Sequence, residues 1–208
     1  MSNLSTTSYA LLGQLALRPW NTYELAREIG RNLRYFWPRA ESQIYTEARR
    51  LAERGLAQAT RDRVGRRPRV TYSITPEGRA ALLEWLDRRP RSITLEFEAL
   101  LRVLLAPLGT KDQLLAAVEQ ARLDVEELVH AVRPRIGQEY LHGQAPFQHH
   151  AHVRAFVFDF LTDYGLLVER WAQRTRSEIE HWTDTTPDDR EDRALRIIGA
   201  AMQRDRPA

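Results

Sequence analysis

Cysteine is absent from this chain of 208 residues, which rules out disulfides, thiolate nucleophiles and sulfur-ligated zinc. Lysine occurs once, as Lys111, so arginine supplies all the other basic residues. No stretch approaches the roughly 18 consecutive apolar residues that a membrane helix needs. The first twenty residues also lack the basic segment and the long apolar core of a secretion signal. We therefore expect a cytoplasmic protein without a membrane partner.

Signatures of catalysis are missing as well. The chain contains no glycine-rich phosphate loop, no GxSxG motif and no pair of carboxylates in a recognisable catalytic frame. One cluster suggests a metal ligand set, but it has no carboxylate at a familiar ligand spacing; its members are His142, His149, His150 and His152. The sequence therefore predicts a protein that is not an enzyme and that uses neither a metal nor a cofactor.

The positive charge is concentrated near the N-terminus. Residues 1–90 contain 16 basic and 9 acidic residues, whereas residues 91–208 contain 15 basic and 19 acidic residues. An asymmetry of this kind indicates that one part of the chain meets a polyanion while the other has a different task. The arginine-rich and proline-containing segment 88–92 is the best candidate boundary, so we expect two domains, 1–90 and 91–208.

Three short helices are predicted at the start of the chain. The first spans 5–17, with serine and threonine available as N-caps and Pro19 after its end. The second begins at Asn21, which forms a capping-box pattern with Glu24, and its apolar positions continue through Leu33 to Phe36. The third spans about 39–54, follows Pro38 and ends at Gly55.

A basic hairpin is predicted to follow the third helix. Segments 56–60 and 69–74 have the composition of strands and flank a turn-rich tip at 62–68. Five arginines occur within nine positions there: Arg61, Arg63, Arg66, Arg67 and Arg69. Such a density of guanidinium groups favours contact with solvent or with anions such as phosphate. Three helices followed by a basic hairpin is the order of a winged helix-turn-helix domain.

The third helix has the features of a DNA-recognition helix. Its apolar stripe is Ile44, Ala48 and Leu51, and the helical period of 100° per residue directs the polar positions away from that stripe. Tyr45 lies about 100° from the stripe, so its ring can pack against the core or its hydroxyl can reach a phosphate. The predicted DNA-binding residues are Ser42, Gln43, Tyr45, Thr46, Arg49, Arg50, Arg63, Arg66, Arg67 and Arg69.

The remainder of the chain is predicted to be helical. A fourth helix starts at Thr75 and Pro76 and runs to about Arg88, and an apolar helix follows at 94–106. A capping box of Thr110 and Gln113 opens a long helix that Pro134 disturbs. After a break at 143–146 we expect a helix over 147–183, then a polar interruption at 184–192 and a short helix at 193–203.

A homodimer is predicted from the apolar surface of these helices. Apolar positions from Val153 to Trp171 alternate steps of four and three, as in a coiled-coil seam, and the helix at 94–106 is apolar on more than one face. A second copy of the chain would cover these surfaces. The predicted dimerisation residues are Phe97, Leu101, Leu104, Val157, Phe160, Tyr164, Leu167 and Trp171.

Three segments of the N-terminal part resemble the PadR-like transcriptional regulators: YALLGQL at 9–15, QIY at 43–45 with RLAERGL at 50–56, and RVTYSITPEGR at 69–79. The apolar opening at 94–105 and the long paired helices are similar to the larger, virulence-activator branch of that family. The resemblance implies a winged helix-turn-helix domain, dimerisation through C-terminal helices and an operator with two-fold symmetry. It also implies a recognition helix containing Gln43, Tyr45 and Thr46, and a wing around Arg66, Arg67 and Arg69.

The resemblance carries one departure and one expectation about ligands. The position that is often a capping serine in relatives is Ala40 here, so the cap of the recognition helix must come from elsewhere. Many relatives are repressors that small phenolic or drug-like molecules release from DNA. Trp85, Trp171 and Trp182 are candidates to line such a ligand cavity, but the tryptophans are also natural core residues.

The resulting expectation is a mainly α-helical regulator, with a small β-hairpin, that binds double-stranded DNA as a homodimer. It would act as a repressor and respond to a small-molecule effector. The alternative is a winged-helix module that assembles with other proteins and has no specific affinity for DNA.

Overall fold

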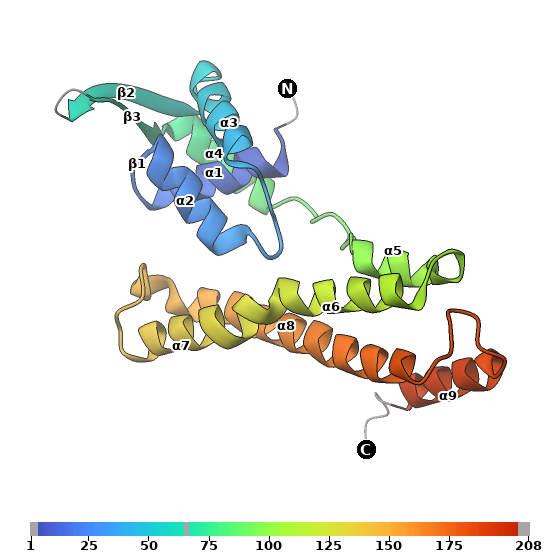
Figure 1. Cartoon of the computed structure of the whole chain (residues 1–208). Coiled ribbons are helices and arrows are strands. Elements are labelled where there is room, and N and C mark those ends of the chain that lie inside the picture. Colours follow the sequence, from blue (N-terminus) through green and yellow to red (C-terminus); the bar gives the residue numbers. More distant parts are fainter. Residues whose placement is uncertain (1–3, 65–66, 204–208) are drawn as a thin grey trace. The chain divides into compact units, whose positions relative to one another are not determined.

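The computed structural model describes residues 4–64 and 67–203, apart from six side chains (Asn32, Asp62, Arg63, Val64, Arg67 and Pro68). The chain divides into two compact units, Met1–Ile93 and Thr94–Ala208. Helices make up most of both units, and a small sheet lies in the first (Figure 1). The fold class is therefore the predicted one, mainly α-helical with a β-hairpin.

The first unit has the element order of a winged helix-turn-helix domain. Its three strands form an antiparallel sheet in the order β1-β3-β2. The described elements are α1 (Thr6–Leu17), β1 (Trp20–Asn21), α2 (Thr22–Leu33), α3 (Glu41–Glu53), β2 (Ala57–Val64), β3 (Arg67–Ile74) and α4 (Pro76–Leu86).

Local capping explains where these helices begin. Ser5 and Ser8 form a reciprocal capping box at the start of α1. The Asn21 side chain accepts a hydrogen bond from the Glu24 backbone N–H at 2.9 Å, and Thr75 caps α4 in the same way. Gly55 ends α3 with a φ of 71°, a left-handed conformation that glycine adopts without strain.

Three features of this unit differ from the sequence-based expectation. The strands β2 and β3 extend into the tip that was expected at 62–68. Phe36 was expected to continue the apolar stripe of the second helix, but α2 ends at Leu33 and Phe36 is exposed. The strand β1 was not predicted, because two residues leave no periodic signal; it exists because Trp20 pairs with Tyr72 across the sheet. The core beneath the sheet is apolar and fully buried, and includes Leu11, Leu12, Leu15, Leu25, Ile44 and Leu51.

The second unit is built around two long antiparallel helices, α6 and α8 (Figure 1). Leu114 and Val118 of α6 pack with Ala172 and Ile179 of α8, and a second cluster forms farther along the same pair. The elements are α5 (Glu98–Leu104), a 3₁₀ turn (Ala106–Leu108), α6 (Lys111–Glu127), a π-helical segment (Leu128–Val132), α7 (Arg133–Leu141), a second 3₁₀ turn (Gln148–His150), α8 (Ala151–Glu180) and α9 (Arg190–Met202).

Helix lengths in the second unit correct three predictions. The apolar helix expected at 94–106 begins only at Glu98, and the helix expected at 147–183 is confined to Ala151–Glu180. The final helix, α9, begins at Arg190 rather than at 193. The capping box of Thr110 and Gln113 is present as predicted.

The π-helical segment packs closely against α8 at Gly165. Leu128 and Val129 are adjacent in the chain, yet both are buried, and both lie next to Gly165 of α8. A Cβ atom on Gly165 would stand 2.8 Å from Cγ2 of Val129. The absence of a side chain at Gly165 therefore lets α8 pack against this segment.

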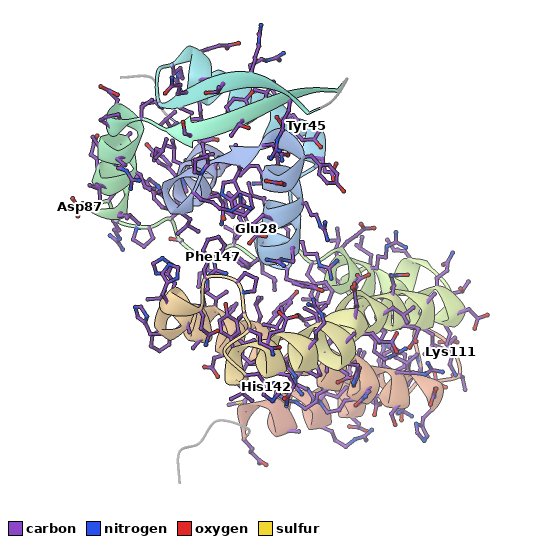
Figure 2. All side chains as sticks on the ribbon, turned by 90° about the vertical axis from the view of Figure 1, so that its left-hand side faces the viewer. Glu28, Tyr45, Asp87, Lys111, His142 and Phe147 are labelled. Atoms are coloured by element: carbon purple, nitrogen blue, oxygen red, sulfur yellow. The ribbon has the colours of Figure 1, made fainter. Side chains whose placement is uncertain are left out.

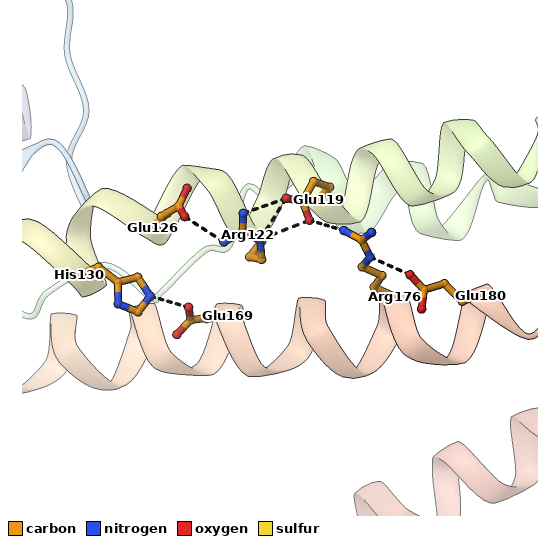
Figure 3. Close-up of polar contacts among 7 residues, drawn as sticks. All are labelled: Glu119, Arg122, Glu126, His130, Glu169, Arg176 and Glu180. Carbon is orange, nitrogen blue, oxygen red and sulfur yellow. Dashed lines mark hydrogen bonds and ion pairs between the residues drawn. The ribbon is translucent and has the colours of Figure 1, made fainter.

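Charged residues join α6 to α8 along one side of the pair (Figure 3). Glu119 accepts hydrogen bonds from Arg122 on its own helix and from Arg176 of α8, at 2.8 and 3.1 Å. The Arg122 guanidinium lowers the pKa of the Glu119 carboxyl, an effect that partial burial opposes. His130 and Glu169 make a further cross-helix contact at 2.7 Å.

Within residues 4–64 and 67–203, no helix combines the length and the apolar content that crossing a bilayer requires.

Candidate nucleic-acid interface

The polar face of α3 is exposed while its opposite face is buried. Ile44, Ala48 and Leu51 are fully buried in the core of the first unit. The predicted contact residues Ser42, Gln43, Thr46, Arg49 and Arg50 are all exposed. A helix of 13 residues held by one apolar stripe thus presents amide, hydroxyl and guanidinium groups to solvent, and these groups can form hydrogen bonds with base edges and phosphates.

Two side chains on this face form polar contacts with other residues of α3. Thr46 donates its hydroxyl proton to the carbonyl of Ser42 at 2.9 Å. Arg49 lies 3.9 Å from the carboxylate of Glu53, an exposed pair that is weak in water. Neither interaction is strong enough to prevent these side chains from contacting a charged ligand.

Tyr45 is half-buried and lies at the side of the polar face (Figure 2). Its hydroxyl donates to the Glu41 carboxylate at 3.4 Å. Burial and the negative charge of Glu41 raise the pKa of the Tyr45 phenol, so the hydroxyl stays protonated near neutral pH and can donate to a phosphate. The position of Tyr45 is therefore compatible with both predicted roles: its ring can pack against the core, and its hydroxyl can reach a phosphate.

The N-terminus of α3 has no side-chain cap, as the alanine at position 40 predicts. Beside it lies an open hollow of about 480 Å³, lined by polar residues of α1 and α3; its lining is Ser5, Thr7, Arg39, Ser42, Gln43, Thr46 and Glu47. Arg39 donates to the Thr7 hydroxyl at 3.3 Å, as does the Trp37 indole. The first turn of α1 thus supports the turn that leads into α3.

The hairpin of β2 and β3 projects from the sheet next to α3 (Figure 1). Its register runs from the pair Ala57 and Ile74 to the pair Val64 and Arg67. Arg61 is exposed, and Arg69 pairs with Glu24 of α2 at 3.5 Å. Arg66 lies outside the described residues, and so do the side chains of Arg63 and Arg67.

Sequence reasoning missed Glu47. This residue lies three positions after Ile44 and four before Leu51, which places a carboxylate on the apolar side of the helix. Its side chain is only 13% exposed. The sequence does contain a signal for this residue: a charge at a core-facing helix position needs a polar partner inside the protein.

The residues predicted for dimerisation fall into two groups in the second unit. Phe97, Tyr164 and Trp171 pack against the unit's own cluster of Ala121, Val125 and Val168. The other five are exposed in the single chain: Leu101, Leu104, Val157, Phe160 and Leu167. Among these, Leu104 is 75% exposed and Phe160 is 62% exposed, which is unusual for side chains of this size.

A cavity of about 570 Å³ lies in the second unit among α5, α6 and α8. Phe97 and Tyr164 contribute aromatic walls, and Glu96 and Asp124 contribute carboxylates. Two of the tryptophans considered as ligand platforms pack elsewhere: Trp85 stacks on Tyr9 at 4.9 Å, and Trp182 packs against the cluster of Leu114 and Ile179. Trp171 lies behind the cavity wall, where its ring meets that of Phe97 edge-on at 5.5 Å.

Two members of the histidine cluster, His149 and His150, lie close together. The rings of His149 and His150 lie 4.1 Å apart, and burial together with neighbouring positive groups lowers the pKa of His150. Across the described part of the chain, no three side chains of histidine, aspartate or glutamate are grouped so that they could hold a metal ion.

Residues 11–84 match the family model of the PadR-like transcriptional regulators. A probable transcriptional regulator from Mycobacterium tuberculosis is 34% identical over 79 residues. That alignment covers 38% of this chain and only 42% of the relative, so it spans well under half of either protein.

Two solved structures share the fold over most of the chain. PadR of Bacillus subtilis in complex with operator DNA has a TM-score of 0.68 and 20% identity, covering 86% of this chain and 99% of that one. The virulence activator AphA of Vibrio cholerae has a TM-score of 0.63 and 21% identity, covering 84% and 98%. At these identities the likeness establishes the fold. PadR of Bacillus subtilis has also been solved with p-coumaric acid.

Proposed function

We propose that this protein acts as a homodimer on an operator with two-fold symmetry. The premise is that residues 11–84 match the family model of the PadR-like transcriptional regulators. The matched family and the relatives named above are regulators rather than enzymes, so no catalytic activity is proposed. We place its action in the cytoplasm, where a bacterial regulator meets the chromosome.

The observation that carries this proposal is the exposed polar face of α3 beside an arginine-bearing hairpin. Gln43 and Arg50 are the residue types that form paired hydrogen bonds with adenine and guanine edges. Arg61 on β2 is exposed and suited to backbone phosphates. We assign base contacts to α3 and phosphate contacts to the hairpin, including Arg63, Arg66 and Arg67 at its tip.

Dimerisation is proposed to bury the exposed apolar side chains of the second unit. Leu101, Leu104 and Phe160 would each gain stability from removal of their apolar surface from water. A two-fold axis in the second unit would then set the distance between two copies of α3. Successive major grooves lie about 34 Å apart, which fixes the half-site spacing that such a dimer can read.

The proposal also includes repression of transcription and release from DNA by a small-molecule effector. The cavity lined by Phe97 and Tyr164 has a volume within the range of small-molecule sites. A solved relative binds p-coumaric acid, which supports a search for an aromatic effector. An effector that favours one dimer geometry needs a few kcal/mol of differential binding to displace the dimer from DNA.

The test is fluorescence anisotropy with DNA from the gene's own promoter and with a scrambled duplex, each at two salt concentrations. We expect tight binding with one dimer per operator and a clear preference for the promoter. Equal and weak binding to both duplexes would contradict the proposal.

An assembly module without specific DNA binding is the second candidate, and the hairpin distinguishes the two. Replacing Arg66 and Arg67 by alanine should weaken DNA binding and reduce its salt dependence if the hairpin contacts phosphates. Binding that does not change in this double variant would favour the assembly module.

A further inference from the structure

The capping box of α1 leaves one hydroxyl proton that needs an acceptor outside the box. The Ser5 hydroxyl oxygen accepts from the Ser8 backbone N–H at 3.1 Å, and the Ser8 hydroxyl oxygen accepts from the Ser5 backbone N–H at 3.0 Å. Each oxygen therefore accepts from the backbone. The two oxygens also lie 2.9 Å apart, so one hydroxyl can donate its proton to the other, and the second proton is left to be donated elsewhere. The side chain of Ser8 is completely buried, so its proton cannot be left to water.

The acceptor is supplied by the recognition helix. Ser8 donates a hydrogen bond to Oε1 of Glu47, and the Ser5 hydroxyl lies 3.4 Å from the same oxygen. Hydrogen bonds to a carboxylate are stronger than those between neutral groups. The other oxygen, Oε2, lies 3.9 Å from the guanidinium of Arg50, which belongs to the exposed polar face of α3.

These contacts give α3 a directional attachment to α1. The remaining contacts of α3 with the core come from Ile44, Ala48 and Leu51, whose apolar packing is non-directional. Packing of that kind permits a small rotation of the helix about its axis, whereas a hydrogen bond between fixed atoms restricts it. A rotation of α3 would displace Gln43 and Arg50 relative to the base edges.

We infer that Glu47 is a positioning residue for DNA recognition. Its carboxylate fixes the rotation of α3 through the Ser5 and Ser8 hydroxyls, and it draws Arg50 toward one side of the polar face. Glu47 itself makes no contact with DNA. This inference rests on the proposed function, since it concerns the geometry with which α3 meets an operator.

Glu53 provides a matched control on the same helix. It lies 3.9 Å from Arg49, which is the same distance as that between Glu47 and Arg50, but its side chain is 67% exposed and its partner is exposed as well. Alanine at position 47 or 53 therefore removes the same charge from the same helix. Only the change at position 47 removes the attachment to α1.

The experiment compares Glu47→Ala, Glu47→Gln, Glu53→Ala and Ser8→Ala in the full-length protein. For each we would measure the ratio of affinities for the promoter and for a scrambled duplex, together with thermal unfolding by circular dichroism. Glu47→Ala should lower the affinity ratio about tenfold, which corresponds to about 1.4 kcal/mol. Glu53→Ala should leave the ratio within about threefold, although both variants should bind scrambled DNA more tightly through loss of a negative charge.

Glu47→Gln keeps an oxygen acceptor at the same place, so its affinity ratio should stay close to that of the original protein. Ser8→Ala should lower the ratio in the same direction as Glu47→Ala, because it removes the main donor. An unchanged ratio in folded Glu47→Ala would overturn the inference. If Glu47→Ala does not fold, an unchanged ratio in Ser8→Ala would overturn it instead. Failure of the unsubstituted protein to prefer the promoter would instead contradict the proposed function. The failure of the inference and the failure of the proposed function therefore give different results.

Discussion

Replacing Gly165 by alanine adds one methyl group where α8 meets the π-helical segment. The new Cβ would stand 2.8 Å from Cγ2 of Val129 and 3.4 Å from Cδ2 of Leu128. Both neighbouring side chains are buried, and valine has few rotamers available in a helix, so neither can move away easily. We expect the substitution to destabilise the second unit.

The magnitude follows from two opposing effects. Alanine is favoured over glycine in a helix interior by about 1 kcal/mol. Overpacking in a well-packed core typically costs about 1–3 kcal/mol. Because a 2.8 Å contact is far inside the normal carbon–carbon distance of about 3.5–4.0 Å, we place the cost in the upper half of that range. The net loss is then about 1–2 kcal/mol, which lowers the unfolding midpoint by roughly 2–8 °C in a chain of this size.

Thermal unfolding followed by circular dichroism measures this shift, and Gly199→Ala is the matched control. Gly199 lies in α9, and a Cβ placed on it meets nothing within 4 Å, so alanine there should raise the midpoint through helix propensity alone. Adding Val129→Ala to Gly165→Ala should relieve the clash and recover part of the loss. The reasoning would be refuted if Gly165→Ala raised the midpoint as much as Gly199→Ala does.

Three further predictions concern the ends of helices. Ala40→Ser supplies the missing cap of α3 and should stabilise the first unit by about 0.5–2 kcal/mol, measured by denaturant unfolding. Lys111→Met removes donors to the carbonyls of Glu180 and Trp182 at the end of α8 and should lower the melting temperature, whereas an unchanged value would mean that water replaces the ammonium group. Hydrogen bonding from Arg193 lowers the pKa of the Glu178 carboxyl, so the pair stabilises α9 above the ordinary pKa of 4.5 and loses this effect as the pH falls through the lowered value. The hydrogen-exchange protection factors of α9 should therefore fall at acidic pH. Glu178→Gln should reduce that dependence, while Asp189, whose pKa Arg193 also lowers, should retain part of it.

The parts of the fold that were predictable depend on neighbours in the chain. The capping boxes at Ser5 and Thr110 are formed by residues three positions apart, so the sequence alone marks where these helices begin. The buried stripe of α3 follows from helical periodicity in the same way. The exposed residues assigned to DNA follow from that stripe, because they occupy the opposite face.

What was not predictable depends on residues far apart in the chain. The strand β1 exists because Trp20 meets Tyr72, and two residues carry no period from which to recognise it. The helix expected at 94–106 begins only at Glu98. Apolar residues occur both in helices and in irregular segments, and here an irregular segment packs Phe97 against α8. The role of Glu47 was overlooked because it depends on a hydrogen bond with Ser8, which lies 39 positions earlier in the chain.

The π-helical segment Leu128–Val132 also bears on how this chain can tolerate insertions and deletions. A π turn holds one more residue than an α turn, so deleting one residue within it would convert it to ordinary α-helix with its backbone hydrogen bonds retained. Because the deletion removes the one residue by which a π turn exceeds an α turn, the helix from Arg133 onward would keep its orientation relative to α6. In an ordinary α-helix a single-residue deletion rotates every later side chain by about 100°. Here it would leave the helix continuous and the phase of α7 unchanged, so homologues with such a deletion would be expected to keep the same apolar pattern downstream.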